Sequence, residues 1–396
     1  MSARKIPLRL AVFGAALLLL LFFSNDFGLI DIQKTSIVTA VAIDAGEEGI
    51  DVTVQIAVPK SGSTAASNVT VKDAATMMDA IAELNLKTGW YPTLVHCRLI
   101  LLGEEAAKDN VFDHIDYFLR SQFVEDTCLV ALCRGRAEKA LSAQSPVGDM
   151  TYAAIEKVLS SEAQQTGLVS VNILREFSKG YFGAGESSFL PLLTVREGAE
   201  TGGSDAGSGD ANAGGSGGAG SSGGKAVFEA SETALFLRGK QVATLGAEET
   251  LAFNLADTDT DLAYGNVTVT ERGEPVIYSL KMRIGKKLLK VRAEGEIPVL
   301  CFSIRARAQV ADVNRAGSAH EVAQSSIVPE SVLRAAEETF RARLSDAFSK
   351  AQESGCDLFG VCSSLQRFYP KLWKKLGKEA LAQTKPVYDI QFDTMH

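Results

Sequence analysis

The feature that most constrains the fold is a low-complexity segment in the middle of the chain. Residues Gly198 to Gly224 consist almost entirely of glycine, serine, alanine, aspartate, asparagine and threonine. Such a composition buries too little apolar surface to offset the entropy lost on ordering, which is typical of a flexible linker or disordered loop. We therefore predict a linker at residues 198–225 between an N-terminal region, 29–197, and a C-terminal domain, 226–396. A chain of 396 residues is long enough for two or three domains.

The N-terminal region alternates predicted strands and helices. A β-branched run at Ile37–Ile43 and alternating apolar side chains from Val52 to Val58 indicate two strands joined by a turn. The elements predicted after them are a helix at Asp73–Leu86, a strand at Leu94–Leu102, a helix at Glu104–Leu119, a strand at Thr127–Cys133, and helical stretches around Ala137–Leu141, Tyr152–Ser160 and Val171–Phe177. This order predicts an α/β region of one or two subdomains, with a mixed rather than a doubly wound sheet.

The C-terminal domain begins with predicted strands. They lie at Ala226–Glu229, Thr233–Leu237, Asn266–Thr270, Val276–Ile284, Leu288–Ala293 and Val299–Ala311. In the last of these, apolar and polar side chains alternate from Phe302 to Gln309, which is typical of an antiparallel sheet with one face in water.

Helices follow these strands. One is predicted at Ser331–Gln352, because a single stripe contains the apolar residues Val332, Ala336, Phe340, Leu344, Ala347 and Ala351. Another is expected at Leu358–Leu376, disturbed by Pro370, and Pro386–Met395 is predicted to form a closing strand. Strands followed by helices predict an α+β domain. The fold class expected for the whole chain is therefore multidomain α+β and mixed α/β, with helices packed on mixed and antiparallel sheets.

The first 28 residues are predicted to be a membrane anchor or a signal segment. Arg4, Lys5 and Arg9 precede an uncharged apolar run from Leu10 to Phe23, whose membrane-facing residues we take as Leu10, Phe13, Leu17, Leu20 and Phe23. The run is shorter than the roughly 20 residues of a full span. We favour an uncleaved signal anchor over a cleaved signal peptide or a buried helix. The positive flank predicts that the bulk of the chain lies on the extracytoplasmic side.

The sequence predicts no catalytic, cofactor or metal site. The formal net charge of -8 argues against non-specific nucleic-acid binding, which needs a basic surface. The neighbours His96 and Cys97 would point to opposite faces of a strand, so they do not form a nucleophile–base pair. No metal-ligand spacing or phosphate-binding loop is present in the sequence.

One basic run invites two interpretations. Lys371, Lys374, Lys375 and Lys378 surround Trp373. The simpler interpretation is a solvated helix face. The alternative is a contact with anionic lipid or with a partner subunit, for which Trp373, Lys371, Lys374 and Lys375 are the candidate residues.

Three ordered stretches carry a resemblance to a known family. They are Asp31 to Asp44 with the strand that follows, Leu94 to Glu105 leading into Phe118-Leu119-Arg120, and the run DLFGVCSSLQRFYPKLWKK that begins at Asp357. Together they resemble the C subunit of the nutrient-germinant receptors of spore-forming bacteria. The resemblance implies a non-enzymatic subunit made of several α/β domains on a short tether. It also implies a place at the outer face of the spore inner membrane, beside two integral-membrane partner subunits, one of them similar to amino-acid transporters.

The chain departs from this family at one point. Where the family has a lipidated cysteine, this sequence has Ser24, Asn25 and Asp26, so the run Leu10–Phe23 would have to anchor the protein by itself. Two other functions remain open from the residues alone. One is an exported, membrane-anchored module that binds a ligand or the cell envelope and has no part in germination. The other is a hydrolase of the cell envelope, whose site only the fold would assemble.

Overall fold

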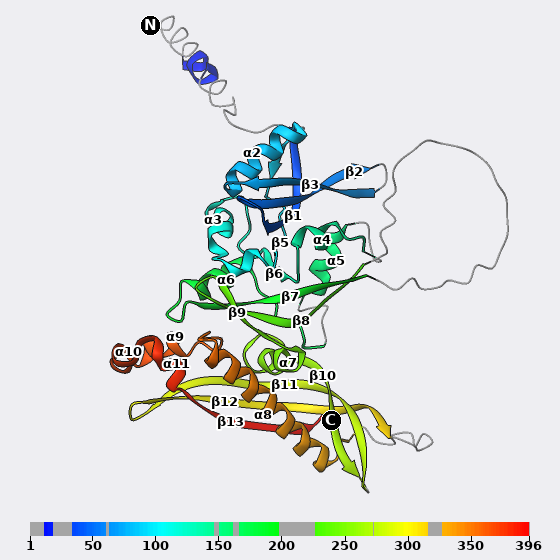
Figure 1. Cartoon of the computed structure of the whole chain (residues 1–396), viewed down its shortest axis with the longest axis vertical. Helices are drawn as coiled ribbons and strands as arrows, with labels where there is room; N and C mark the ends of the chain where they lie inside the picture. The colour runs from blue at the N-terminus through cyan, green and yellow to red at the C-terminus, as the bar shows by residue number, and fades with distance from the viewer. Residues whose placement is uncertain are drawn as a thin grey trace, which may run out of the picture.

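The computed structural model describes residues 12–18, 34–60, 63–145, 150–160, 166–197, 226–271, 273–315 and 327–395. From residue 34 onward these form two stacked lobes (Figure 1). We call residues 34–245 the N-terminal lobe and residues 247–395 the C-terminal lobe. Each lobe has its own sheet, with helices packed against it.

In the described residues, the N-terminal lobe contains one nine-stranded mixed sheet. Its order is β3-β2-β1-β5-β6-β7-β8-β9, and β4 pairs with the start of β1. The parallel centre, β1-β5-β6-β7, is flanked on both sides by antiparallel strands. The strands are β1 (Thr35–Ala45), β2 (Ile50–Lys60), β3 (Ser63–Ala74), β4 (Tyr91–Thr93), β5 (Leu99–Leu102), β6 (Leu129–Cys133), β7 (Ser187–Glu197), β8 (Ala226–Leu237) and β9 (Lys240–Leu245).

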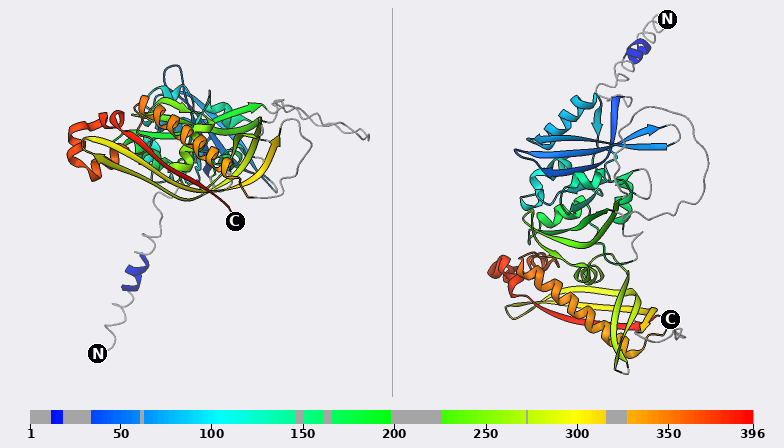
Figure 2. Two further views of the ribbon diagram at one scale, coloured as in Figure 1. Left: turned by 90° about the horizontal axis from the view of Figure 1, so that it is seen from below. Right: turned by 45° about the vertical axis from the view of Figure 1, so that its right-hand side comes forward.

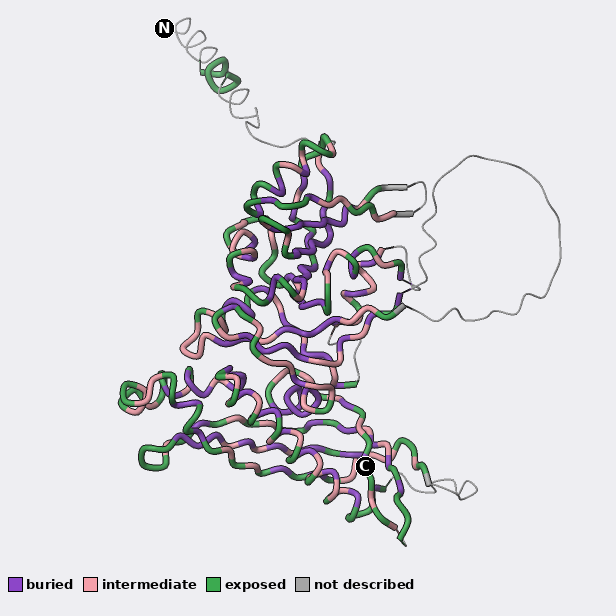
Figure 3. Tube along the Cα trace, in the orientation of Figure 1, coloured by how far each residue is buried: buried purple, intermediate pink, exposed green. Residues whose placement is uncertain are grey.

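Helices bury both faces of this sheet. Successive residues of β5 alternate between two cores: Ile100 and Leu102 belong to one, Leu99 and Leu101 to the other. The first core also contains residues of α2 (Met77–Thr88), α3 (Phe112–Arg120), α6 (Leu174–Tyr181) and the short 3₁₀ turn η2 (Ala106–Lys108), and the second contains residues of α4 (Ala137–Ser142) and α5 (Thr151–Val158). The buried residues of the central strands accordingly run through the middle of the lobe (Figure 3).

The C-terminal lobe is a helix-covered sheet of four strands in the described residues, ordered β10-β11-β12-β13. β10 to β12 are antiparallel, whereas β13 lies parallel to β12. The long helix α8 crosses one face of the sheet (Figure 1). The elements are α7 (Ala247–Asp257), β10 (Leu262–Glu271), β11 (Glu274–Glu294), β12 (Ile297–Arg315), α8 (Glu330–Glu353), α9 (Val361–Phe368), α10 (Pro370–Leu376), η3 (Gly377–Glu379), α11 (Ala380–Gln383) and β13 (Lys385–Thr394).

The fold class predicted from the sequence is confirmed, with local corrections. The helix expected at Asp73–Leu86 begins only at Met77, because β3 continues to Ala74. The strand expected at Leu94–Leu102 is β5 alone, so His96 and Cys97 lie before it in a turn. The helix expected at Glu104–Leu119 divides into η2 and α3, and that expected at Leu358–Leu376 divides into α9 and α10 beside Pro370.

The predicted domain boundary falls between two paired strands. Residues 198–225 lie outside the described residues, so their predicted flexibility stays a prediction. The strands on either side, β7 and β8, pair antiparallel with Glu197 opposite Ala226. The N-terminal sheet therefore continues past the low-complexity segment, and the two sheets separate only after β9.

Candidate functional site

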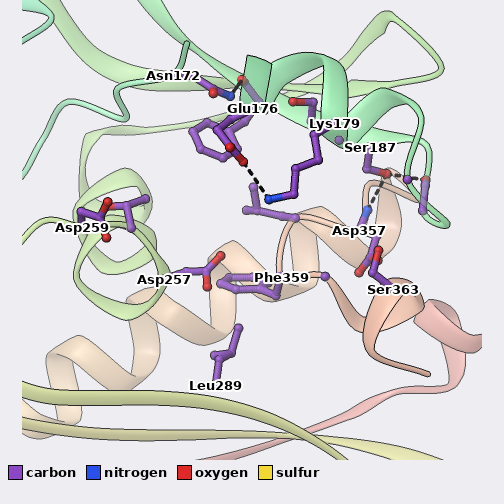
Figure 4. Close-up of a pocket in the computed structure, with 18 of the residues that line it drawn as sticks. Asn172, Glu176, Lys179, Ser187, Asp257, Asp259, Leu289, Asp357, Phe359 and Ser363 are labelled. Carbon is purple, nitrogen blue, oxygen red and sulfur yellow. Dashed lines mark hydrogen bonds and ion pairs between the residues drawn. The ribbon is translucent and has the colours of Figure 1, made fainter. Parts of the chain in front are cut away.

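A cavity of about 700 Å³ lies where the two lobes meet. Its wall in the N-terminal lobe comes from α6 and β7, and its wall in the C-terminal lobe comes from the end of α7, from Leu289 of β11 and from the segment between α8 and α9. Figure 4 shows the labelled side chains that these separate elements bring to it. Residues 169–189, 257–260, 289 and 357–364 thus share one site although they are far apart in sequence.

The segment Ser354–Gly360, which we call the junction loop, connects the lobes beside this cavity. Asp357 N donates a hydrogen bond to Ser187 Oγ of β7 at 2.8 Å, and Ser187 Oγ donates to Gly185 O at 2.7 Å. Cys356 Sγ donates to Phe236 O of β8 at 3.4 Å. Because Cys356 and Asp357 are both buried, the junction loop is a fixed contact between the lobes.

The Asp357 carboxylate holds the start of α9. Its two oxygens accept hydrogen bonds from Val361 N at 2.7 Å and Cys362 N at 2.8 Å, which satisfies two backbone donors that the helix leaves unpaired. Burial raises the pKa of Asp357, and these backbone hydrogen bonds oppose that effect. The junction loop packs so closely against Gly185 that no side chain fits there. A Cβ added at position 185 would lie 2.6 Å from Asp357 Cβ.

Two other carboxylates face the cavity with no hydrogen bond or ion pair to the described residues. They are Asp257, the last residue of α7, and Asp259 beyond it. The Asp257 side chain is accessible from the cavity, yet the surrounding protein removes much of its hydration and raises its pKa to about 6. The positive charge of Lys287 lowers the pKa of Asp257, and the negative charge of Asp357 raises it.

The fourth carboxylate of the cavity, Glu176, is already paired with a cation. Glu176 Oε2 on α6 accepts a hydrogen bond from Lys179 Nζ at 3.0 Å, and this bond is the largest cause of the lowered pKa of Glu176. The free carboxylates at Asp257 and Asp259 therefore leave the opposite wall acidic, beside apolar groups such as Phe359. This combination suits a small polar molecule with a cationic group.

The described residues offer no catalytic arrangement in this cavity. Ser187 Oγ is engaged in structural hydrogen bonds, because it accepts from Asp357 N of the junction loop and donates to Gly185 O, a backbone carbonyl that does not act as a general base. Burial raises the pKa of Cys362 above its ordinary value and that of Cys356 to about 12, which makes both poor nucleophiles. Within the described ranges there is no group of three or more side chains that could hold a metal ion.

The residues predicted to contact lipid or a partner lie elsewhere. Lys371, Lys374 and Lys375 are exposed on α10, and Trp373 is partly buried against the core of the C-terminal lobe. Lys375 forms an ion pair with Glu296. The structure brings these four residues together on α10, far from the start of the N-terminal lobe (Figure 1).

Only part of the predicted anchor falls in the described residues. Phe13 and Leu17 are exposed on the helical segment 12–18, whereas Leu10, Leu20 and Phe23 lie outside the described ranges. Among the residues that can be described, no helix combines the length and apolar character that a membrane span requires.

The acidic wall of the cavity was not predicted from the sequence. Asp257 ends a helix that the sequence had not predicted, although the run Asp257 to Asp261, DTDTD, was visible as a signal of alternating carboxylates. The sequence marks Asp357 as the start of a family-like run, but it does not indicate that Asp357 caps a helix or takes part in a contact between lobes.

The structure defines a two-lobed protein of mixed α/β and α+β architecture. Its lobes contact each other at the junction loop, where the buried Asp357 also caps α9. The same fold occurs in a solved structure described as the crystal structure of the GerBC protein. The two chains are 17% identical with a TM-score of 0.51, and the match covers 90% of this chain and 97% of that one. No curated protein matches this chain.

Two family descriptions match consecutive parts of the sequence. Residues 29–195 match the spore germination protein N-terminal domain, and residues 231–393 match the C-terminal domain described as spore germination B3/GerAC like. The chain therefore belongs to the GerAC-like family of spore germination proteins, the C subunits of germinant receptors. Membership confirms the resemblance inferred from the sequence. It gives the chain a role in spore germination, in receptor complexes associated with the spore membrane.

Proposed function

We propose that this chain is a non-enzymatic, membrane-tethered subunit of a nutrient germinant receptor that acts beside two integral-membrane subunits, one of them transporter-like. The observation that carries the proposal is the match of both family domains, in order, across most of the chain. The cavity supports the non-enzymatic part, since its acidic wall and its engaged serine suit binding rather than bond cleavage.

The tether is the N-terminal apolar run. Arg4, Lys5 and Arg9 precede it and favour a cytoplasmic start, so both lobes would lie on the extracytoplasmic side of the spore inner membrane. In the absence of a lipidated cysteine, Leu10, Phe13, Leu17, Leu20 and Phe23 supply the apolar surface that enters the bilayer.

We assign α10 to a partner subunit rather than to lipid. Its exposed Lys371, Lys374 and Lys375 belong to the C-terminal lobe, away from the place where the tether joins the N-terminal lobe (Figure 1). A basic helix there complements an acidic surface on a neighbouring protein.

Isolation of the full-length chain from spore membranes tests this assignment. We expect two integral-membrane subunits to be recovered with the unmodified chain. Changing Lys371, Lys374 and Lys375 to Glu should reduce that recovery. The matched control changes Arg283, Lys286 and Lys290, exposed cations on β11, to Glu and should leave recovery unchanged. Recovery of the chain without any integral-membrane protein would contradict the proposal.

The cavity favours a ligand-binding task for this chain within that role. Small cationic molecules should then bind the purified full-length chain, and Asp257→Asn should abolish that binding; equal binding by both chains would contradict the task.

A further inference from the structure

One strip of the solvent-facing surface of α2 is apolar, although such a surface is ordinarily polar. Met77, Ala80, Ile81 and Leu84 form its buried face. On the opposite side Met78, Ala82 and Leu86 follow one another at four-residue intervals, and the side chains of Met78 and Leu86 are 60% and 82% exposed. Met78 and Leu86 are therefore not part of the core of the lobe, and their apolar character needs another explanation.

Two exposed aromatic residues follow the helix directly along the chain. α2 ends at Gly89, which adopts φ 72°, and the chain then turns into Trp90 and Tyr91. These side chains are 48% and 42% exposed. We call Met78, Ala82, Leu86, Trp90 and Tyr91 the apolar stripe. Several exposed apolar side chains within one short segment are typical of an interaction surface.

The apolar stripe lies where the N-terminal segment joins the lobe. Tyr91 in β4 pairs directly with Thr35, the first residue of β1. Figures 1 and 2 show α2 at the end of the molecule farthest from the C-terminal lobe. Only residues 24–33 separate the apolar run, which ends at Phe23, from Lys34. Even fully extended, such a segment reaches only about 35 Å, so a run inserted in a bilayer keeps this end of the lobe near the membrane surface.

The composition of the stripe fits the interfacial region of a bilayer. Tryptophan and tyrosine concentrate at membrane–water interfaces, where an apolar ring and a polar group are both accommodated. The neighbouring charges on α2 have no positive excess, because Lys87 pairs with Glu83 at 2.9 Å and Asp79 in the first turn adds a negative charge. A contact made here is therefore apolar and needs no anionic lipid.

We propose that the apolar stripe rests in the headgroup region of the membrane, so that the N-terminal lobe stands on the bilayer and the C-terminal lobe projects away from it. This inference depends on the membrane tether proposed above, and it adds an orientation that a tether alone does not set. The cavity and α10 would then lie on the far side of the N-terminal lobe, accessible to soluble molecules and to partner domains.

The chain has two tryptophans, and they report on the two ends of the molecule separately. Trp373→Phe leaves Trp90 in the stripe as the only tryptophan, and Trp90→Phe leaves Trp373 on α10. Each full-length variant is reconstituted with uncharged phosphatidylcholine vesicles, with or without brominated acyl chains as a quencher. We expect blue-shifted, quenched emission from Trp90 that persists at high salt, and unchanged emission from Trp373.

The outcomes separate this inference from the proposed tether. Failure of the full-length chain to float with vesicles would contradict the tether, and the inference would fall with it. A chain that floats while Trp90 is not quenched, or while Trp373 is quenched instead, overturns the inference alone. Emission from Trp90 that is already blue-shifted without vesicles would show that another part of the chain covers the stripe, which also overturns it.

A second pair of variants checks the stripe itself. Leu86→Asp places a charge in the proposed contact and should abolish quenching of Trp90 in the Trp373→Phe chain, while flotation through the tether continues. Leu288→Asp, at an exposed leucine of the C-terminal lobe, is the matched control and should leave the quenching unchanged. Circular dichroism establishes that both variants are folded. Equal quenching in both chains would overturn the assignment.

Discussion

At the scale of single residues, Asp357 has two structural roles. Its backbone N–H binds Ser187 in the other lobe, and its carboxylate caps α9. Loss of a capping side chain costs about 1–2 kcal/mol of stability. We therefore expect Asp357→Ala to lower the free energy of unfolding by at least that amount, measured by urea denaturation. Asp259→Ala, in the same cavity but without a partner in the described residues, should change it by no more than about 0.5 kcal/mol. Equal effects would contradict the capping role.

The raised pKa of Asp257 makes the stability of the chain depend on pH in a defined direction. Its pKa of about 6 lies above the ordinary 3.8, so the folded chain keeps a proton that the unfolded chain has already released. The stability that this proton contributes is complete below pH 3.8 and is lost as the pH rises through about 6. Asp257→Asn should consequently gain stability relative to the unmodified chain as the pH is raised from about 4 to about 7. A difference in stability that stays constant over that range would show that Asp257 has an ordinary pKa.

Asp357 could be predicted from the sequence in part, and Asp257 could not. Asp357 begins a run that is similar to a known family, so its importance could be predicted but its contacts could not. Asp257 contributes to the cavity only because α7 ends beside the junction loop, and no local pattern specifies that contact. A site built from four separate segments depends on long-range packing, which spacing along the chain does not encode.

At the scale of elements, α8 holds the C-terminal lobe together. The predicted stripe from Val332 to Ala351 is the face that the structure buries against the sheet. Leu344 lies at its centre and is fully buried, so Leu344→Ala should cost about 2–5 kcal/mol of unfolding free energy. Ser349→Ala, at an exposed position of the same helix, is the control and should be nearly neutral. The two values come from thermal or urea unfolding, and a small effect at Leu344 would contradict the packing described.

Some elements were predictable and others were not, for physical reasons. α8 has one apolar stripe, and its 3.6-residue period predicted the helix and its buried face. α7 was missed because Thr250 to Ala256 are all buried, the polar Thr250 and Asn254 included, so apolar and polar residues do not mark a buried and an exposed face. The composition of residues 198–225 suggested a boundary, yet the pairing of β7 with β8 on either side of it is a long-range contact.

At the scale of the whole molecule, the two lobes have different proposed roles. The N-terminal lobe carries the tether and the apolar stripe, and the C-terminal lobe carries α10 (Figure 1). The cavity lies between them, beside the junction loop. A ligand bound there contacts both lobes, so it could alter their relative position only by working against the buried hydrogen bonds of Cys356 and Asp357.

Nutrient-triggered germination of spores that lack this chain tests the central claim most directly. In a strain without paralogous receptors, deletion should abolish the response to the nutrients that this receptor serves. Re-expression of the full-length chain should restore that response, and germination by agents that bypass receptors should stay normal. An unchanged response of the deletion spores to every nutrient would contradict the account.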